Sequence, residues 1–244
     1  MMHCQLWPRR FPTAWTGAWP FEWLLSRRPP QATDEDMDTS LSSGRKFGGK
    51  TADERRAERR SQLLHAGIKA YGEKGYRNTT VKAVCDGAGL TERYFYESFS
   101  NSEELLCAGF RYVTDEILVA MQRAAEAQGG DYLARVRAGL LVYLRRLQDK
   151  PAAARVFLIE MASVSPQTEA LMSEALDKFG ALLVDVLQQQ PGREGKRNAS
   201  PLLVRGVVGG GLHMAQTWIS SGYAEDIEVV ADTALRLYAL AARP

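Results

Sequence analysis

Apolar residues recur at helical spacing along most of the sequence after residue 50, and this periodicity restricts the fold more than any other feature. In the first such segment Leu64, Ile68 and Tyr71 fall at positions i, i+4 and i+7, which places them on one face of an amphipathic helix. Four prolines between positions 151 and 201 stand between periodic segments, where proline can begin or end a helix. We find no convincing strand. The sequence therefore predicts an all-α fold.

The expected helices follow from this periodicity and from capping residues. After the first helix, 52–74, Thr79 or Thr80 can cap a short second helix that ends at the break formed by Ala88 and Gly89. Thr91 can cap a third, and the Ser-Asn pair at 100–101 opens a long fourth. Further helices are expected at 133–147, 152–164, 168–189, 202–221 and 224–242.

Composition and charge exclude several classes of protein. The chain has 244 residues, 45% of them apolar and 25% charged, which is typical of a globular protein. Its three cysteines are widely spaced and outside any CxxC pattern, which indicates free thiols and a cytoplasmic protein. No apolar run is long enough for a membrane span, and no histidine has partners at metal-ligand spacing. We therefore expect no membrane partner, no metal, no cofactor and no catalytic residue.

The first residues differ in character from the rest. Four tryptophans lie among prolines and arginines in the first 23 residues, and a polar, then Gly-rich stretch follows. We expect residues 1–44 to be a disordered extension, with a segment that binds a partner or a membrane surface as the alternative. As a hypothesis, Met37 is the natural start, which an intact mass that includes residues 1–36 would contradict. Two domains are predicted to follow this extension. Residues 45–101 form a DNA-binding domain, and residues 102–244 form a domain that binds an effector and dimerises.

The stretch "AVCDGAGLTERYFYESF" predicts a helix-turn-helix. A helix ends near Gly89, where a left-handed turn favours glycine, and a second short helix follows. Phe95 and Phe99, four residues apart, are expected to face the core. The outward residues are then Thr91, Glu92, Arg93, Tyr94 and Tyr96. Arginine can bind a guanine edge in bidentate fashion, glutamate can accept from cytosine, and tyrosine hydroxyls can reach phosphates, so this set suits a DNA groove.

The distribution of charge along the chain also supports DNA binding by this segment. Residues 45–93 hold twelve Lys or Arg and six Asp or Glu, a difference of +6 in a chain whose net charge is only +2. A local basic segment on a nearly neutral protein is what contact with phosphates requires. A charged helix face exposed to solvent is the alternative that charge by itself leaves open.

At residues 56–108 the sequence resembles the tetracycline-repressor (TetR) family of bacterial transcription regulators. The likeness rests on the segment "AYGEKGYRNTTVKAVCDGAGLTERYFYESFSNSEEL", including its Gly-Tyr pair, its Thr-Thr-Val helix start and its Ala-Gly turn. The resemblance implies that Thr79, Thr80 and Lys82 contact phosphates and that residues 91–96 enter the groove. Two departures stand out. Arg93 and Tyr94 occupy positions where the family usually has small residues, so the base preference is this chain's own.

The second departure concerns a backbone contact. Ser102 stands where the family commonly has a phosphate-binding lysine. Lys82 or the arginines of residues 45–60 are the candidates to replace that contact.

Beyond residue 109 the resemblance implies only the architecture, so the effector site must be predicted from the residues. An effector cavity is expected to be apolar with a few polar groups. The candidates are Phe110, Ile117, Tyr143, Phe157, Glu160, Met161 and His213. An ion pair of Glu160 with Arg145 or Arg155 is the alternative to a ligand contact, and a purely structural role is the alternative for His213.

The glycines in "RGVVGGGLHMAQTW" fit no nucleotide-binding motif, and we interpret them as sites where two helices approach closely. In the TetR family the last two helices pair across a two-fold axis, and the apolar series Ile227, Ala231, Ala234 and Tyr238 is compatible with such pairing. A stripe that faces the core of one subunit would look the same.

These features predict a homodimeric repressor that occupies a palindromic operator in double-stranded DNA and is released by a small-molecule effector. The alternative from another class is an all-helical carrier or enzyme with an incidental helix-turn-helix. The dependence of affinity on salt concentration distinguishes the two hypotheses. Operator binding should weaken steeply as the salt concentration rises, whereas the ligand affinity of a carrier need not change.

Overall fold

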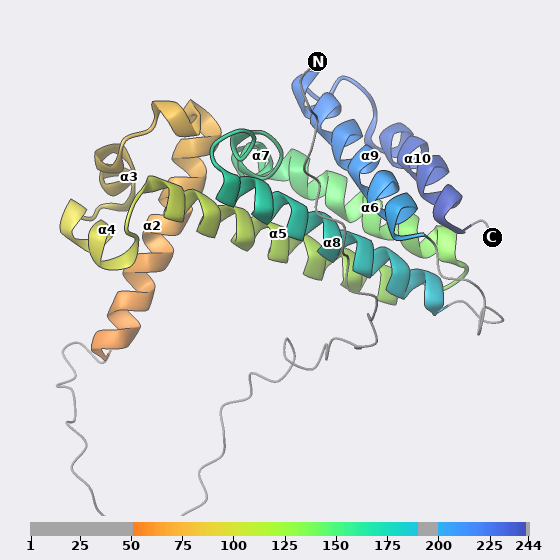
Figure 1. Cartoon of the computed structure of the whole chain (residues 1–244), viewed down its shortest axis with the longest axis horizontal. Helices are drawn as coiled ribbons and strands as arrows, with labels where there is room; N and C mark the ends of the chain where they lie inside the picture. The colour runs from red at the N-terminus through yellow and green to blue at the C-terminus, as the bar shows by residue number, and fades with distance from the viewer. Residues whose placement is uncertain (1–50, 190–199, 243–244) are drawn as a thin grey trace, which may run out of the picture. The chain divides into compact units, whose positions relative to one another are not determined.

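The computed structural model describes residues 51–189 and 200–242, and within these residues every regular element is helical (Figure 1). The predicted all-α fold is confirmed there. The features predicted for residues 1–50, including the disordered extension and Met37 as the start, lie outside the described residues. Residues 190–199 lie outside the described residues as well. No helix among the described residues is both long and apolar enough to cross a bilayer.

In chain order the elements are α2 Ala52–Lys74, η1 Tyr76–Asn78, α3 Val81–Ala88, α4 Glu92–Ser98, α5 Ser102–Ala127, α6 Tyr132–Asp149, α7 Pro151–Arg155, the π-helical turn η2 Val156–Glu160, α8 Pro166–Gln188, α9 Pro201–Ser220, α10 Ile227–Tyr238 and η3 Ala239–Ala242.

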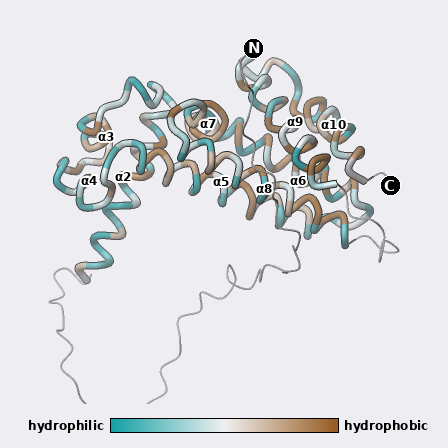
Figure 2. The backbone as a smooth tube through the Cα atoms, viewed as in Figure 1, coloured by the Kyte–Doolittle hydropathy of each residue, from teal (hydrophilic) through white to brown (hydrophobic). Residues whose placement is uncertain are grey.

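Capping residues place the ends of the first helices. Thr51 and Glu54 form a reciprocal capping box at the start of α2, whose first turns are hydrophilic (Figure 2). Gly75 ends α2 at a φ of 86°, a backbone conformation that favours glycine. At the start of α5, Asn101 accepts from the Glu104 amide, and Glu104 accepts from the backbone and side chain of Ser100. These donors from Ser100 lower the pKa of the Glu104 carboxyl.

One predicted helix is wrong in extent. The segment 152–164 was expected to be continuous, but α7 ends at Arg155, a π-helical turn follows, and Ser163 adopts a φ of 58°. Ser165, the residue before Pro166, is extended, as expected of a residue that precedes proline, and it caps the start of α8.

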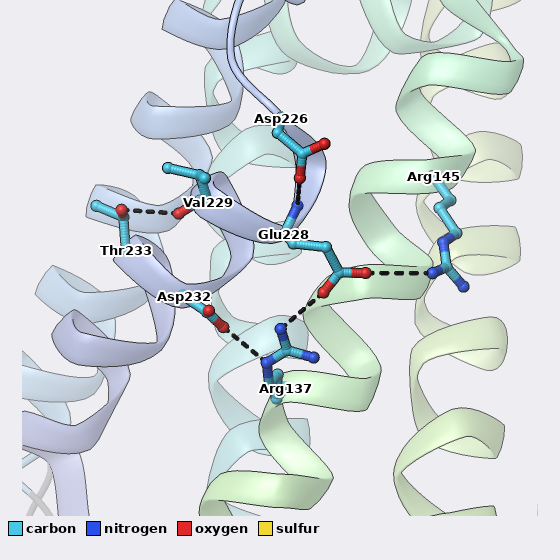
Figure 3. A network of polar contacts seen from close by, with 7 residues as sticks. All are labelled: Arg137, Arg145, Asp226, Glu228, Val229, Asp232 and Thr233. Atoms are coloured by element: carbon cyan, nitrogen blue, oxygen red, sulfur yellow. Dashed lines mark hydrogen bonds and ion pairs between the residues drawn. The ribbon is translucent and has the colours of Figure 1, made fainter.

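The helices share one buried core. α3 and α4 pack on α2, which also contacts α5 and α7. α5 packs against α6 and α8, and α10 packs against α6 and α9 (Figure 1). Ion pairs tie α6 to α10: Arg137 binds Glu228 and Asp232 at 2.7 Å each, and Arg145 lies 3.6 Å from Glu228 (Figure 3).

Candidate DNA-binding surface and interior cavity

A tight turn fixes α4 relative to α3. Gly89 takes the left-handed conformation at a φ of 66°, and the amide of Leu90 donates to the carbonyl of Cys85 at 3.0 Å. Phe95 and Phe99 are buried, as predicted, with their ring centroids 5.9 Å apart. Thr91 occupies the N-cap position of α4, but its side chain makes no capping hydrogen bond. Because Phe95 and Phe99 face the core, the opposite side of α4 is turned to solvent.

The exposed side of α4 carries most of the predicted groove residues. Thr91, Glu92, Arg93 and Tyr96 are exposed, and the Arg93 side chain is 83% accessible. Arg93 donates from Nε to Oε1 of Glu97 at 3.0 Å, an ion pair within one helical turn. Exposed pairs of this kind contribute little to stability, so Arg93 can exchange Glu97 for another acceptor at small cost.

Tyr94 differs from its neighbours because it is half-buried. The guanidinium of Arg59, from α2, lies 4.4 Å from the centre of the Tyr94 ring. A second arginine of α2, Arg60, lies 4.0 Å from the ring centre of Phe99 and bonds the carbonyl of Ser98. These cation–π contacts place two positive charges beside α4. Sequence reasoning missed both roles, because the contacts join helices that are distant in the sequence.

The three residues predicted to contact phosphates differ in their exposure. Thr80 is exposed and caps α3 by accepting from the Ala83 amide. Lys82 is exposed and pairs with Asp86 at 3.0 Å, and this hydrogen bond raises the pKa of Lys82. Thr79 needs correction, because it is buried and its hydroxyl donates to the carbonyl of Gly75 at 2.8 Å. In this conformation the Thr79 hydroxyl is committed to the protein interior.

In the other half of the chain, four aromatic rings meet between α5, α6, η2 and α8. Phe110 stacks on Phe157 with ring centroids 5.7 Å apart, and Phe179 meets Phe157 edge-on at 5.9 Å. Tyr143 contacts both Phe157 and Phe179 at 6.5 Å. Ile117 and Met161 are buried in the same core. We call Phe110, Tyr143, Phe157 and Phe179 the aromatic cluster.

A narrow, partly open cavity of about 40 Å³ lies beside this cluster. Its walls are mainly aliphatic and come from four helices: Met121, Ala125, Arg135, Val136, Gly139, Leu140, Phe179, Leu182, Leu183, Val186 and Tyr238. Phe179 belongs to both the cavity and the cluster. None of the seven predicted effector residues is in this wall, although three of them share the cluster with Phe179. A more open hollow of about 320 Å³ lies on the surface and includes Arg137 and Arg145, the ion-paired arginines of Figure 3.

Two buried hydroxyls stand out in this region. Among the described residues, Thr114 and Tyr143 have side-chain oxygens that are inaccessible to solvent and make no hydrogen bond. Burial raises the pKa of the Tyr143 phenol well above its ordinary value, with a further contribution from Tyr238 nearby. Buried polar groups are normally satisfied, so these two hydroxyls are exceptions among the described residues.

Glu160 lies where η2 meets η1. One carboxylate oxygen accepts from the Tyr76 amide at 2.8 Å, and the other is 3.0 Å from Arg155. The side chain is 12% exposed. Of the two interpretations left open by the sequence, the ion pair with Arg155 is the contact that is present.

His213 was predicted beside the effector, but its side chain is exposed on α9. The buried face of that helix runs through Val204, Gly211 and Trp218, so His213 lies on the other side. In the part of the chain that the structure describes, no group of three or more His, Cys, Asp or Glu is arranged to hold a metal ion.

Comparison with known proteins relates both halves to regulators. A family model described as "Bacterial regulatory proteins, tetR family" matches residues 63–108, which include all of α3, the turn and α4. The chain is 24% identical over 166 residues to the HTH-type transcriptional activator FasR of Mycolicibacterium smegmatis, covering 68% of this chain and 74% of that one. It is 26% identical over 131 residues to the HTH-type transcriptional repressor KstR2 of Rhodococcus jostii, covering 53% and 64%.

Solved structures extend the likeness of fold to the helices beyond α4. The transcriptional regulator FadR from Bacillus subtilis, in complex with stearoyl-CoA, matches with a TM-score of 0.64 at 18% identity over 73% of this chain and 96% of that one. The fatty acid degradation regulator FadR from Bacillus halodurans matches with a TM-score of 0.64 at 16% identity, over 74% and 94%.

Proposed function

The chain belongs to the tetR family of bacterial transcriptional regulators, and we propose that it is a dimeric repressor that leaves a palindromic operator when an apolar effector binds inside its C-terminal helices. The observation that best supports DNA binding is the exposed face of α4. This helix follows the Gly89 turn, and its Arg93 side chain is 83% accessible. A short helix presented in this way can enter a major groove. The aliphatic cavity beside the aromatic cluster supports the effector half.

The first experiment is the selection of genomic DNA fragments that the purified protein retains at near-physiological salt, followed by footprinting of the best fragment. A protected palindrome whose affinity falls steeply with salt is the expected result, because phosphate contacts release counterions. A reporter gene placed behind this site should be less active when the protein is present. Retention of no fragment by protein freed of bound ligand would contradict the proposal and favour the carrier alternative.

The proposed dimer uses α9 and α10. Leu202 is 81% exposed and Val229 is 52% exposed, although both are apolar. Gly206 and Gly209 lie on the same side of α9 as Leu202, one and two turns on, and a Cβ atom at either glycine would meet nothing within 4 Å. Small residues beside exposed apolar ones allow a second copy to approach closely. A second copy of this chain is therefore the proposed occupant, consistent with two-fold operators.

Leu202→Asp should weaken this dimer. A carboxylate buried in an apolar contact would lack a partner, so we expect a loss of about 2 kcal/mol or more in dimerisation free energy. Analytical ultracentrifugation at micromolar concentration measures it. Val119→Asp is the matched control, because Val119 is also apolar and 40% exposed but lies on α5. Equal dimer affinity in the two variants would argue against the α9 and α10 interface.

The proposed route from effector to DNA runs through η2. Phe157 belongs to the aromatic cluster, and Glu160, three residues on, holds the Tyr76 amide next to α2. Arg77 adds a second link by donating to the carbonyl of Ser163 at 3.3 Å. An effector that displaces Phe157 would therefore shift the two groups that hold η1. The ligand's preference for the shifted state would supply the free energy of release.

Glu160→Gln should weaken this coupling while leaving the fold intact. The amide keeps the shape of the side chain but loses the ion pair with Arg155 and accepts the Tyr76 amide less strongly. With stearoyl-CoA as the first probe, we expect the ligand-induced loss of operator affinity to shrink by about fivefold or more. Fluorescence anisotropy of labelled operator, with and without the probe, measures this ratio. Glu174→Gln, which removes an exposed ion pair with Lys178, is the control. A ratio equal to that of the wild type would contradict the relay.

A further inference from the structure

We propose that Arg60 of α2 is a positioning residue for sequence recognition, which holds the end of α4 and so sets the angle at which Arg93 and Tyr96 meet the bases. The inference rests on the proposed function, because it requires that α4 enters a DNA groove. It assigns a share of the specificity to a helix outside the helix-turn-helix. The observation that carries it is a double contact between the Arg60 guanidinium and the C-terminal end of α4.

α4 is too short to hold its own orientation. It has seven residues, and the side chain of its N-cap residue, Thr91, makes no capping hydrogen bond. Isolated helices of this length are unstable in water and depend on tertiary contacts. Phe95 is the buried residue within α4, and the buried Phe99 follows its end. Two anchors on one side allow a helix to rotate about the line that joins them, so a third contact is needed to fix its angle.

Arg60 supplies such a contact. Ser98 is the last residue of α4, and the last carbonyls of a helix lack partners within the helix. The Nη1 atom of Arg60 donates to the carbonyl of Ser98, and the guanidinium lies 4.0 Å from the ring centre of Phe99. A cation at a helix C-terminus also interacts favourably with the helix dipole. Arg60 therefore ties the end of α4 to α2.

The preceding residue of α2 holds α4 at a second place. Arg59 is half-buried, and its guanidinium lies 4.4 Å from the ring centre of Tyr94, one turn before Ser98. α2 itself is a firm support, because its Leu63 is fully buried and the helix also packs on α5 and α7 (Figure 1). Two consecutive arginines of one anchored helix thus fix α4 at its middle and at its end.

The surroundings of Arg60 favour this role over a direct contact with phosphate. The guanidinium rests on the ring of Phe99, and one of its nitrogens is bonded to the Ser98 carbonyl. Glu104 is also near. Hydrogen bonds from Ser100 chiefly lower the pKa of the Glu104 carboxyl, and the charge of Arg60 lowers it further. A phosphate group at this position would approach that carboxylate as a like charge.

A change in the angle of α4 should affect base contacts more than backbone contacts. Arg93 and Tyr96 are exposed on α4 itself, and bidentate bonds to a base edge require a defined geometry. Lys82 is on α3, so its proposed phosphate contact does not depend on that angle. Loss of Arg60 should therefore reduce the preference for the operator over other DNA, and it should leave non-specific binding nearly unchanged.

The test is the substitution Arg60→Met in the full chain. Fluorescence anisotropy measures the affinity for the footprinted operator and for a random duplex of equal length, at several salt concentrations. We expect the ratio of the two affinities to fall about tenfold, as for the loss of a hydrogen bond from a charged group. Arg56→Met is the matched control, because it removes an equal charge from an exposed position one turn earlier on α2. The control should keep the wild-type ratio, and both variants should bind the random duplex alike.

A double-mutant cycle separates positioning from a general loss of stability. If Arg60 acts by placing Arg93, the effect of Arg60→Met on the ratio should largely disappear when Arg93 is already alanine. Circular dichroism checks that each variant is folded. Arg59→Met, which removes the contact with Tyr94, should lower the ratio in the same direction and serves as the test if Arg60→Met does not fold.

Three results would overturn the inference and leave the proposed function in place. The first is a wild-type ratio in Arg60→Met, or in Arg59→Met where that variant is the test. The second is an equal loss of affinity for both duplexes with a salt slope reduced by about 1, which would make Arg60 a phosphate contact. The third is additive effects of Arg60→Met and Arg93→Ala. A wild type that prefers no sequence over the random duplex would instead overturn the proposed function itself.

Discussion

Gly72→Ala should destabilise the folded protein by roughly 3 kcal/mol or more, which is the largest effect we expect from adding a single methyl group. A Cβ atom at Gly72 would lie 2.2 Å from the carbonyl oxygen of Ala152 and 2.4 Å from its Cα atom. These are backbone atoms of α7, so no side-chain rotation relieves the clash. Because overpacking a core ordinarily costs about 1–3 kcal/mol, a contact this close should reach or exceed the upper limit.

Urea denaturation of the two proteins measures this difference. Gly87→Ala is the matched control, because Gly87 is also within a helix and its added Cβ would meet only the Cβ of Ala66, at an ordinary 3.8 Å. There the better helix propensity of alanine should stabilise the protein by up to about 1 kcal/mol. Similar stabilities of Gly72→Ala and the wild type would mean that α2 and α7 do not approach each other as closely as in this structure.

The contact at Gly72 shows what periodicity can and cannot predict. Leu64, Ile68 and Tyr71 place α2 correctly, because a helix needs only its own apolar spacing and caps to be recognised. The close approach of Gly72 to α7 depends on a residue eighty positions later. The same limit applies to residues 152–164, where the spacing is helical but Phe157 packs against rings of α5, α6 and α8 and Glu160 accepts from the distant Tyr76 amide.

The two sites differ in how far the sequence could predict them. On α4, a turn glycine and two aromatics four residues apart determine which side is buried, so Arg93 and Tyr96 could be placed outward from local geometry. The cavity draws its wall from α5, α6, α8 and α10, and its residues Phe179 and Tyr238 have no local signal that marks them. His213 was misplaced because α9 has small or apolar residues around much of its circumference, which leaves its rotation ambiguous.

Arg93→Ala should weaken operator binding by about 1–3 kcal/mol, or roughly 5- to 150-fold, without changing dimerisation or stability. Arg93 is 83% exposed, so its removal leaves no cavity and breaks only the surface pair with Glu97. A bidentate contact with a guanine edge would be lost at one position of each half-site. Competition anisotropy with single-base variants of the operator measures both the loss and the position where specificity relaxes.

Three comparison variants make this prediction specific. Arg123→Ala removes an equal charge from an exposed site on α5 and should leave operator affinity unchanged. Lys82→Ala should weaken all operator variants about equally and reduce the salt slope by about 1, as expected for a phosphate contact. Glu97→Gln should bind as well as the wild type or better, because it frees Arg93 and removes a negative charge near the phosphates. If Arg93→Ala instead weakens every sequence equally, Arg93 contacts phosphate and another residue of α4 reads the base.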